Sequence, residues 1–582
     1  LHGPLLGYVD DFDDPRSSCR TRYFVGRRHA GSPLGKSAAL VSIDDALKLV
    51  RDTTDVQALS RIRTTLHPVS WRDQATSDEL ALRRDPQALI ALPTKDVTHP
   101  FVQLRMGVSR VHETNRIARP PKIWRAETIL DGKETPYTAR RSELYVSLPG
   151  KPAIKMTSLE FERKGAPPDE PTVVIQGGGP GASPAWYLGG GLGPIIVNER
   201  NEVVPNPESL LSCARLLFLD APGTGDSYMS DRSHEKYFNL EDDANVHAEY
   251  LMQYRAREPE RLGASPIFAM GTSYGVHRWT RALDRLSDHR VPLGGLFLVS
   301  GHLSAALTDF APESITSYAG AIVAFAATAR QHFPEMQRRY PDEAEFLREV
   351  DRFASFEYML AIARGNALPQ EDPERFDRVA RKLAEFIHLD VEYVKEKRLQ
   401  ILPLEFCSTL LPGQTIAALD ARMKTTAVPT EPGADPFAYA LKDMASNFQT
   451  ALTDFMRRDL DYWPTDDLAR PYVVLDVSYD RWGWGPYQNS PTRSQNHLMD
   501  MLRKNPKVNV FAAAGRYDVR SPFTQHTYAF NHLPREVAAR ISFRTYAGGH
   551  MFYMTDSDSR EQFIGDMREF IAQQKAAVVR NA

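Results

Sequence analysis

The sequence predicts an α/β fold in which a mostly parallel β-sheet is flanked by helices. Short apolar runs alternate along the chain with segments of helical periodicity, and this alternation is typical of parallel strands joined by right-handed crossovers. Several of these runs end in glycine-rich turns, and sites in parallel sheets form at the carboxyl ends of the strands. The predicted strands are 172–175, 216–220, 267–270, 296–299, 508–514 and 541–546.

The strand pattern divides the chain into four segments. Residues 121–300 and 471–582 hold the strands of the core, which begins with a hairpin predicted over 144–161. Residues 301–470 show helical periodicity instead, which predicts a helical cap inserted into the core. Residues 1–120 contain no repeat and no motif tied to chemistry, so this extra N-terminal segment is either a docking or regulatory domain or a structural extension. The expected hydrophobic core of the cap includes Phe353, Phe356, Tyr358 and Phe386.

The composition excludes several functional classes. The 582 residues include 71 basic and 74 acidic side chains, and a formal charge of −3 indicates neither nucleic acid nor an anionic membrane as a partner. Three cysteines, Cys19, Cys213 and Cys407, lie too far apart for a disulfide framework or a clustered thiolate metal site. No apolar run reaches the length of a membrane span, and no motif indicates a metal or other cofactor. The compartment and oligomeric state stay open; secretion or a periplasmic location would follow if a leader was removed.

A glycine-flanked serine follows the predicted strand at 267–270. The pentapeptide is Gly271-Thr272-Ser273-Tyr274-Gly275, and a helical pattern follows it. A strand, a tight turn and a helix are the context of a nucleophile elbow, in which the turn presents a serine hydroxyl above the sheet edge. Ser273 is therefore the predicted nucleophile.

A second glycine-rich loop follows the predicted strand at 172–175 and runs from Gly177 to Ser183. A phosphate-binding loop would need a lysine after its last glycine, and this loop has none. In hydrolases that transfer acyl groups, a backbone N–H from such a loop helps to bind the oxyanion. The backbone N–H groups of Gly179 and Tyr274 are the predicted oxyanion donors.

Two further residues follow predicted strands in the last part of the chain. Asp518 lies just after the strand at 508–514, and His550 follows two glycines after the strand at 541–546. The order Ser273, Asp518, His550 is that of the catalytic triad of α/β-hydrolases. In such a triad His550 takes the proton of Ser273 and returns it to the leaving group, while Asp518 orients the imidazole and stabilises its charged form.

The motifs resemble those of the serine carboxypeptidase family over roughly residues 137–571. The resemblance implies the same triad, the same oxyanion donors and the release of C-terminal residues from peptides through an acyl-enzyme; some relatives act as acyltransferases or esterases. Motifs in the cap and the lack of a disulfide framework suit the bacterial branch. The core motifs are Gly178 to Ser183, Asn206-Pro207, Leu217 to Gly225, Ser273-Tyr274-Gly275 and Gly549-His550-Met551; the cap motifs are Gly365 to Leu368, 379–387 and Leu419-Asp420-Ala421-Arg422.

The chain departs from the family where the terminal carboxylate of the substrate binds. The family has Asn where this chain has Gly177, before Gly178, and Glu where it has Thr272. Gln176, Arg278 or an arginine of the cap could take over the binding of the carboxylate. An esterase, acyltransferase or aminopeptidase with the same triad is therefore an alternative to a carboxypeptidase, and a non-catalytic binding or effector protein is a second one.

Trp482 and Trp484 lie between the cap and the last predicted strands. Their large apolar rings could line the acyl pocket of a peptide or ester substrate. Packing at the seam between cap and core is the alternative for both residues.

Overall fold

A computed structural model describes residues 7–12, 21–25, 121–426, 438–460, 462, 472–475, 481–483 and 494–579. The chain divides into two compact units, one made of Leu1–Arg116 and Trp463–Arg470, the other of Ile117–Tyr462 and Pro471–Ala582. In the first unit, strands β1 (Gly7–Phe12) and β2 (Thr21–Val25) pair in antiparallel fashion. The predicted domain boundaries stay predictions.

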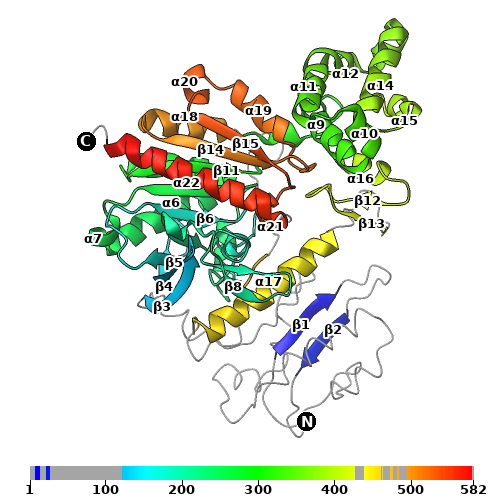
Figure 1. The fold of residues 1–582 in the computed structure, drawn as a ribbon. Helices are drawn as coiled ribbons and strands as arrows, with labels where there is room; N and C mark the ends of the chain where they lie inside the picture. The colour runs from blue at the N-terminus through cyan, green and yellow to red at the C-terminus, as the bar shows by residue number, and fades with distance from the viewer. Residues whose placement is uncertain are drawn as a thin grey trace. The chain divides into compact units, whose positions relative to one another are not determined.

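The second unit contains a nine-stranded sheet with the strand order β15-β14-β11-β10-β6-β9-β5-β4-β3 (Figure 1). The six strands from β15 to β9 are parallel to one another, and the last three are antiparallel. The predicted class, a mostly parallel sheet flanked by helices, is confirmed. The strands are β3 (Lys122–Leu130), β4 (Lys133–Val146), β5 (Ile154–Arg163), β6 (Thr172–Gln176), β9 (Arg215–Leu219), β10 (Ile267–Thr272), β11 (Leu293–Val299), β14 (Asn509–Gly515) and β15 (Ile541–Tyr546).

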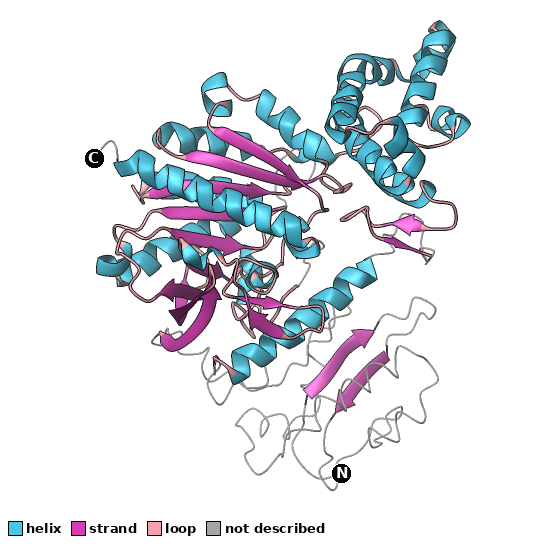
Figure 2. Ribbon diagram, viewed as in Figure 1, coloured by secondary structure: helices cyan, strands magenta, loops and turns pink. Residues whose placement is uncertain are grey.

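Helices cover both faces of this sheet, as Figure 2 shows. Every residue of β6, β9, β10 and β11 is buried, which is typical of parallel strands covered on both faces. Phe570 contacts Phe268 and Phe297 on one face, while Leu296 and Trp279 belong to the core on the other. The helices around the sheet are α5 (Ala185–Leu188), α6 (Leu240–Arg257), α7 (Pro259–Leu262), α8 (Gly275–Asp288), α18 (Ser494–Lys504), α19 (Phe523–Asn531), α20 (Arg535–Ala538), α21 (Phe552–Thr555) and α22 (Ser557–Val579).

A helical insertion follows β11 and has a hydrophobic core of its own. Phe353, Tyr358 and Phe386 are buried in that core, as predicted. The prediction for Phe356 was wrong, because this side chain is 71% exposed; a helical segment turns one face inward, and Phe353 and Tyr358 occupy it. The helices of the insertion are α9 (Ile315–His332), α10 (Pro334–Arg339), α11 (Glu343–Phe353), α12 (Met359–Ile362), α13 (Leu368–Glu371), α14 (Pro373–Ile387), α15 (Val391–Glu396) and α16 (Pro403–Thr409).

Two short hairpins and one long helix complete the described elements. The hairpins are β7 (Ile195–Val197) with β8 (Val203–Pro205), and β12 (Thr415–Ile416) with β13 (Lys424–Thr425). The helix is α17 (Ala438–Arg458). Within the part of the chain that the structure describes, no helix is long and apolar enough to cross a membrane. The same residues include no group of three or more His, Cys, Asp or Glu side chains that could hold a metal ion.

Candidate active site

Ser273 lies at the turn between strand β10 and helix α8. Its φ angle is 53°, which is the left-handed region that non-glycine residues rarely adopt. The turn is fixed on both sides, since the Ser273 N–H donates to the Val299 carbonyl at 2.9 Å and the Ser273 carbonyl accepts from the Val276 N–H at 3.0 Å. Strain of this kind persists only where the surroundings hold it, and it is typical of functional turns.

Asp518 and His550 are brought together from the loops after β14 and β15. Nδ1 of His550 lies 2.6 Å from Oδ2 of Asp518. The Asp518 carboxylate is fully buried, and its Oδ1 accepts a 2.8 Å hydrogen bond from the Ser521 N–H. A carboxylate fixed in this way sets the orientation of the imidazole and stabilises its protonated form. Nε2 is then the ring nitrogen left for proton exchange with a hydroxyl.

The sheet brings the elbow and the acid–base pair to one edge. Strands β10, β11, β14 and β15 are neighbours and parallel, so their carboxyl ends lie side by side. Ser273 follows the first of these strands, and Asp518 and His550 follow the last two. This edge is where sites of open parallel sheets form.

Three other histidines near this edge stay neutral. Burial lowers the pKa of His277 to about 3 and that of His526 to about 3. Burial also holds the pKa of His302 well below its usual range, and its neighbours His526, His277 and His550 lower it further. His302 and His526 lie ring to ring, with centroids 5.1 Å apart.

The glycine-rich loop after β6 packs directly against the elbow. A Cβ atom at Gly178 would lie 2.4 Å from the Thr272 carbonyl oxygen and 2.8 Å from the Ser273 Cβ. Only glycine lets the loop come this close to Ser273. Gly179 follows with a φ angle of 103°, so the predicted oxyanion donors Gly179 and Tyr274 belong to two backbone segments in contact.

The same loop explains one departure from the family pattern. A Cβ atom at Gly177 would lie 2.6 Å from the Ser183 carbonyl oxygen and 2.7 Å from that of Ala182. An asparagine therefore cannot occupy this position without a shift of the backbone. Thr272, which stands where the family has Glu, is buried, and its hydroxyl has no hydrogen-bond partner among the described residues.

An ion pair that the sequence analysis missed lies behind both predicted oxyanion donors. Nε of Arg278 donates to Oδ2 of Asp243 at 2.7 Å, and Nη1 of Arg278 donates to the Gly177 carbonyl at 2.9 Å. The Tyr274 hydroxyl donates to the same Asp243 oxygen at 2.9 Å. Both charged side chains are fully buried.

These contacts correct two expectations about binding of the substrate carboxylate. Arg278 is committed to Asp243 and Gly177 inside the core, so it does not present a cation to a substrate. Gln176 is also fully buried, and its amide is a hydrogen-bond partner of the His247 ring. Burial lowers the pKa of His247 to about 4, so this partner is neutral at ordinary pH.

Trp482 is buried beside the elbow. Its ring stacks on Phe238 at a centroid distance of 5.4 Å and meets the Tyr274 ring edge to face at 5.2 Å. With Leu240 these residues form a small hydrophobic cluster, which favours the packing role over an open pocket wall. Trp484 lies outside the described residues.

Comparison with known proteins finds similarity to serine carboxypeptidases over part of the chain. The model of the serine carboxypeptidase family matches residues 145–291, which include the glycine-rich loop and the elbow. Serine carboxypeptidase S10 family member 1 of Dictyostelium discoideum is 29% identical over 120 residues, or 20% of this chain and 28% of that protein. Carboxypeptidase Y homolog A of Pyrenophora tritici-repentis is 24% identical over 221 residues, or 34% of this chain and 40% of that protein. The resemblance to serine carboxypeptidases predicted from the motifs is thereby confirmed.

The matched stretch spans well under half of the length of either relative. Asp518 and His550 lie outside the family match. The bacterial branch stays a prediction, since both relatives are eukaryotic. Among solved structures, the prohormone-processing carboxypeptidase Kex1 of Saccharomyces cerevisiae aligns with 74% of this chain and 91% of its own, at 13% identity and a TM-score of 0.48.

Proposed function

We propose that this protein is a serine hydrolase of the serine carboxypeptidase type, which releases C-terminal residues from peptides through an acyl-enzyme. The observation that carries the proposal is the 2.6 Å contact between His550 and the buried Asp518, at the sheet edge where the strained Ser273 turn lies. A nucleophile, a base and an orienting acid are the groups that acyl transfer by serine needs.

In the proposed mechanism, His550 removes the proton of the Ser273 hydroxyl as its oxygen attacks the scissile carbonyl. The negative charge that develops on the carbonyl oxygen is bound by the N–H groups of Gly179 and Tyr274. His550 then donates its proton to the leaving amine, and a water molecule, deprotonated by His550, hydrolyses the ester on Ser273. Asp518 keeps the imidazole in the required tautomer throughout.

A second candidate function is an esterase, acyltransferase or aminopeptidase with the same triad. The observation that favours it is the closed space at Gly177, where an asparagine side chain cannot fit, together with the commitment of Arg278 to Asp243. Both facts remove groups that could hold the carboxylate at the end of a peptide. A non-catalytic binding protein is the remaining alternative.

Mass spectrometry of N-blocked peptides incubated with the wild-type protein and with Ser273→Ala tests the proposal. Stepwise loss of C-terminal residues with the wild type alone is the expected result. Intact peptides, together with Ser273-dependent cleavage of a simple ester, would overturn the carboxypeptidase assignment and support the second candidate. If a fluorophosphonate probe also failed to label Ser273, the protein would be a binding protein and not a hydrolase.

A further inference from the structure

One short segment that follows helix α16 of the cap contacts the loops of both Asp518 and His550. This segment, residues 418–422, lies between β12 and β13 and is called the strap below. The Ala418 carbonyl accepts hydrogen bonds from the Val519 and Arg520 N–H groups, each at 3.0 Å. The Ala421 N–H donates to the Tyr517 carbonyl at 2.9 Å. The backbone on both sides of Asp518 is thus bonded to the strap.

The strap also contacts the loop that carries His550. The His550 N–H donates to the Leu419 carbonyl at 2.5 Å. A Cβ atom at Gly549 would lie 2.1 Å from that carbonyl oxygen and 2.5 Å from the Asp420 Cα. A residue with any side chain at position 549 would therefore push the base loop and the strap apart.

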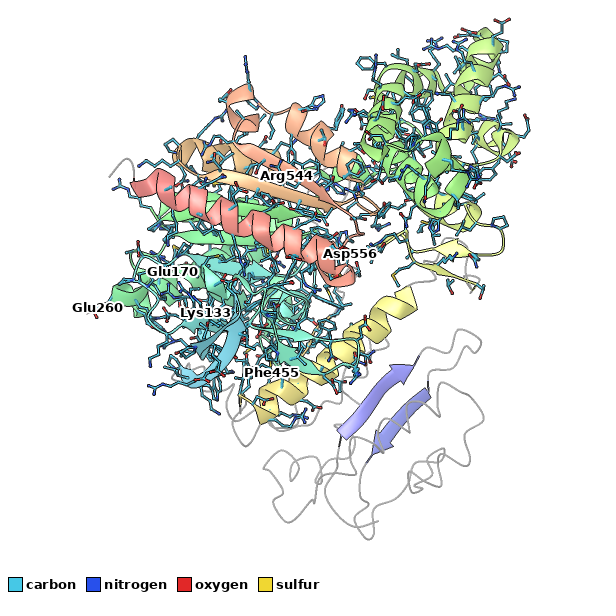
Figure 3. The ribbon with its side chains drawn as sticks, in the orientation of Figure 1. Lys133, Glu170, Glu260, Phe455, Arg544 and Asp556 are labelled. Carbon is cyan, nitrogen blue, oxygen red and sulfur yellow. The ribbon has the colours of Figure 1, made fainter. Side chains whose placement is uncertain are left out.

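Arg422 fastens the strap to the base loop by its side chain. Nε and Nη2 of Arg422 donate to the Asp420 carboxylate at 2.9 and 2.7 Å. Nη1 donates at 3.0 Å to the Ala547 carbonyl, three residues before His550, and at 3.0 Å to Asp556. Asp556 precedes α22 and is labelled in Figure 3. The Arg422 side chain is 21% exposed, so these ion pairs are partly shielded from water.

The strap is also joined to the helices of the cap. His332, the last residue of α9, contacts the Ala421 carbonyl through its Nε2 at 2.6 Å. The Tyr517 hydroxyl donates to Glu343, the first residue of α11, at 3.2 Å. A displacement of the cap helices would therefore reach the loop of Asp518 both directly, through Tyr517, and through the strap, and it would reach the loop of His550 through the strap.

We propose that the strap sets the spacing between Asp518 and His550, and that Arg422 is the positioning residue that keeps it in place. The inference rests on the proposed function, in which His550 is the general base. The two loops come from different strands, and the strap bonds to both. Its anchoring by Arg422 keeps the carboxylate and the imidazole at the distance where their hydrogen bond forms.

The test compares Arg422→Met and Arg422→Lys with the wild type. Arg422→Met removes every donor of the guanidinium, and we expect kcat to fall by about 10- to 100-fold, because small misplacements of catalytic groups cost this much. KM should change by less than about threefold, since Arg422 positions the base and does not hold the substrate. Arg422→Lys keeps a charged donor and should recover part of kcat.

The matched control is Arg339→Met, which removes an exposed ion pair with Glu385 elsewhere in the cap. This variant should keep the wild-type kcat. If Arg422→Met does not fold, Asp556→Ala removes one partner of the guanidinium and should lower kcat as well. An unchanged kcat in the folded Arg422 variant, or an equal fall in the control, would overturn the proposal.

A readout independent of turnover is the far-downfield proton NMR signal of the His550 Nδ1–H, which reports its hydrogen bond to Asp518. We expect this signal in the wild type and in Arg339→Met, and its weakening or shift in Arg422→Met. An unaltered signal in Arg422→Met contradicts the role of the strap. A protein that shows the signal but has no Ser273-dependent activity contradicts the proposed function instead, so the two failures are distinguishable.

Discussion

The Tyr274 hydroxyl donates a 2.9 Å hydrogen bond to the buried carboxylate of Asp243, which anchors the residue after Ser273 to helix α6. Arg278 binds the same oxygen and also the carbonyl of Gly177, two residues before Gly179. One carboxylate therefore fixes both backbone segments that supply the proposed oxyanion donors. Preorganised donors stabilise a transition state because they need not reorient as charge develops.

Tyr274→Phe tests this anchoring, because it removes the bond to Asp243 and keeps the backbone N–H. We expect kcat to fall by about tenfold, consistent with the loss of one hydrogen bond to a charged group. KM should change little, since the oxyanion forms only in the transition state. Steady-state kinetics on a chromogenic ester measures both constants.

The control for this variant is Tyr250→Phe. Tyr250, which lies on α6, is buried as Tyr274 is, and it donates a 2.7 Å hydrogen bond to Ser158. Ser158 lies on β5, which is remote from the elbow in the sequence and in the sheet order. Its loss should lower stability without lowering kcat. Equal falls in kcat for the two variants would show that the Asp243 anchor has no special role.

Gly178→Ala should impair the nucleophile itself. The added methyl group would lie 2.4 Å from the Thr272 carbonyl oxygen and 2.8 Å from the Ser273 Cβ, so the loop or the elbow must move. We expect labelling of Ser273 by a fluorophosphonate probe to slow by at least about tenfold, because misplaced reacting groups react much more slowly. Gly565→Ala on α22, where nothing lies within 4 Å of the added atom, is the control and should label at the wild-type rate.

Much of the sheet could be predicted because its central strands are continuous apolar runs. The runs at 172–175, 267–270 and 296–299 became β6, β10 and β11 within a few residues. Strand β3 and residues 133–143 of β4 were not predicted. Exposed, partly buried and buried side chains are mixed along both stretches, and charged residues interrupt them, so neither stretch forms an apolar run.

The positions of the Ser273 turn and of the Asp518–His550 contact could be predicted because each of these residues closely follows a strand in the sequence, while their catalytic roles stay predictions. The contacts of Asp243, Arg278 and the strap could not be predicted, although Arg278 and residues 419–422 were singled out in the sequence, since their partners are far away along the chain. One signal was available for Asp243: it shares the inward face of α6 with Val246, Tyr250 and Tyr254. A carboxylate in an apolar helical stripe indicates a buried partner.

Replacement of His526 by Phe should make the protein less sensitive to acid. Burial lowers the pKa of His526 to about 3, whereas an unfolded chain protonates histidine near 6.5. Between these values the unfolded state binds more protons, so stability is complete above pH 6.5 and falls as the pH drops through this window. Phe cannot be protonated, and at this position it can stack on Phe543 as the imidazole does.

Urea unfolding at pH 4.5 and pH 7.5 measures the difference for wild type and His526→Phe. The loss of unfolding free energy on acidification should be smaller in the variant, by an amount on the order of a few kcal/mol. His532→Phe, at an exposed position just after the same helix, is the control. A variant as acid-sensitive as the wild type would mean that burial of His526 does not contribute to acid unfolding.

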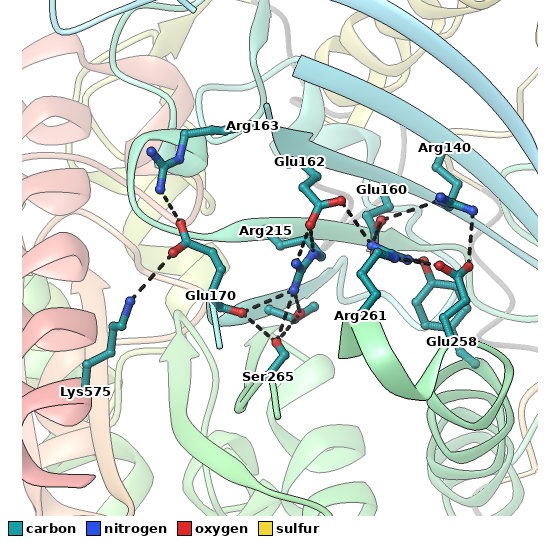
Figure 4. A network of polar contacts seen from close by, with 12 residues as sticks. Arg140, Glu160, Glu162, Arg163, Glu170, Arg215, Glu258, Arg261, Ser265 and Lys575 are labelled. Carbon is teal, nitrogen blue, oxygen red and sulfur yellow. Dashed lines mark hydrogen bonds and ion pairs between the residues drawn. The ribbon is translucent and has the colours of Figure 1, made fainter. Parts of the chain in front are cut away.

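Arg215 is the center of a partly buried polar network that joins β5, β9 and the start of β6 (Figure 4). Its side chain is 1% exposed, and Nε donates to Glu162 at 2.8 Å. Nη1 donates to the Glu170 carbonyl at 3.2 Å and to the Ser265 hydroxyl at 3.3 Å. Removal of one partner from a buried ion pair leaves the other charge uncompensated, and this costs far more than the net value of the pair.

Arg215→Met should therefore lower the unfolding free energy by about 3 kcal/mol, the low end of the range for buried pairs, because Glu162 is 20% exposed. Arg364→Met removes a cap ion pair with Glu371 in which both side chains are more than half exposed, and it should cost at most about 1 kcal/mol. Chemical denaturation of both variants at one pH makes the comparison. Equal losses would contradict the role assigned to the buried network, because the same substitution is made at both sites, and the sites differ in their exposure to water and in the hydrogen bonds that Arg215 makes.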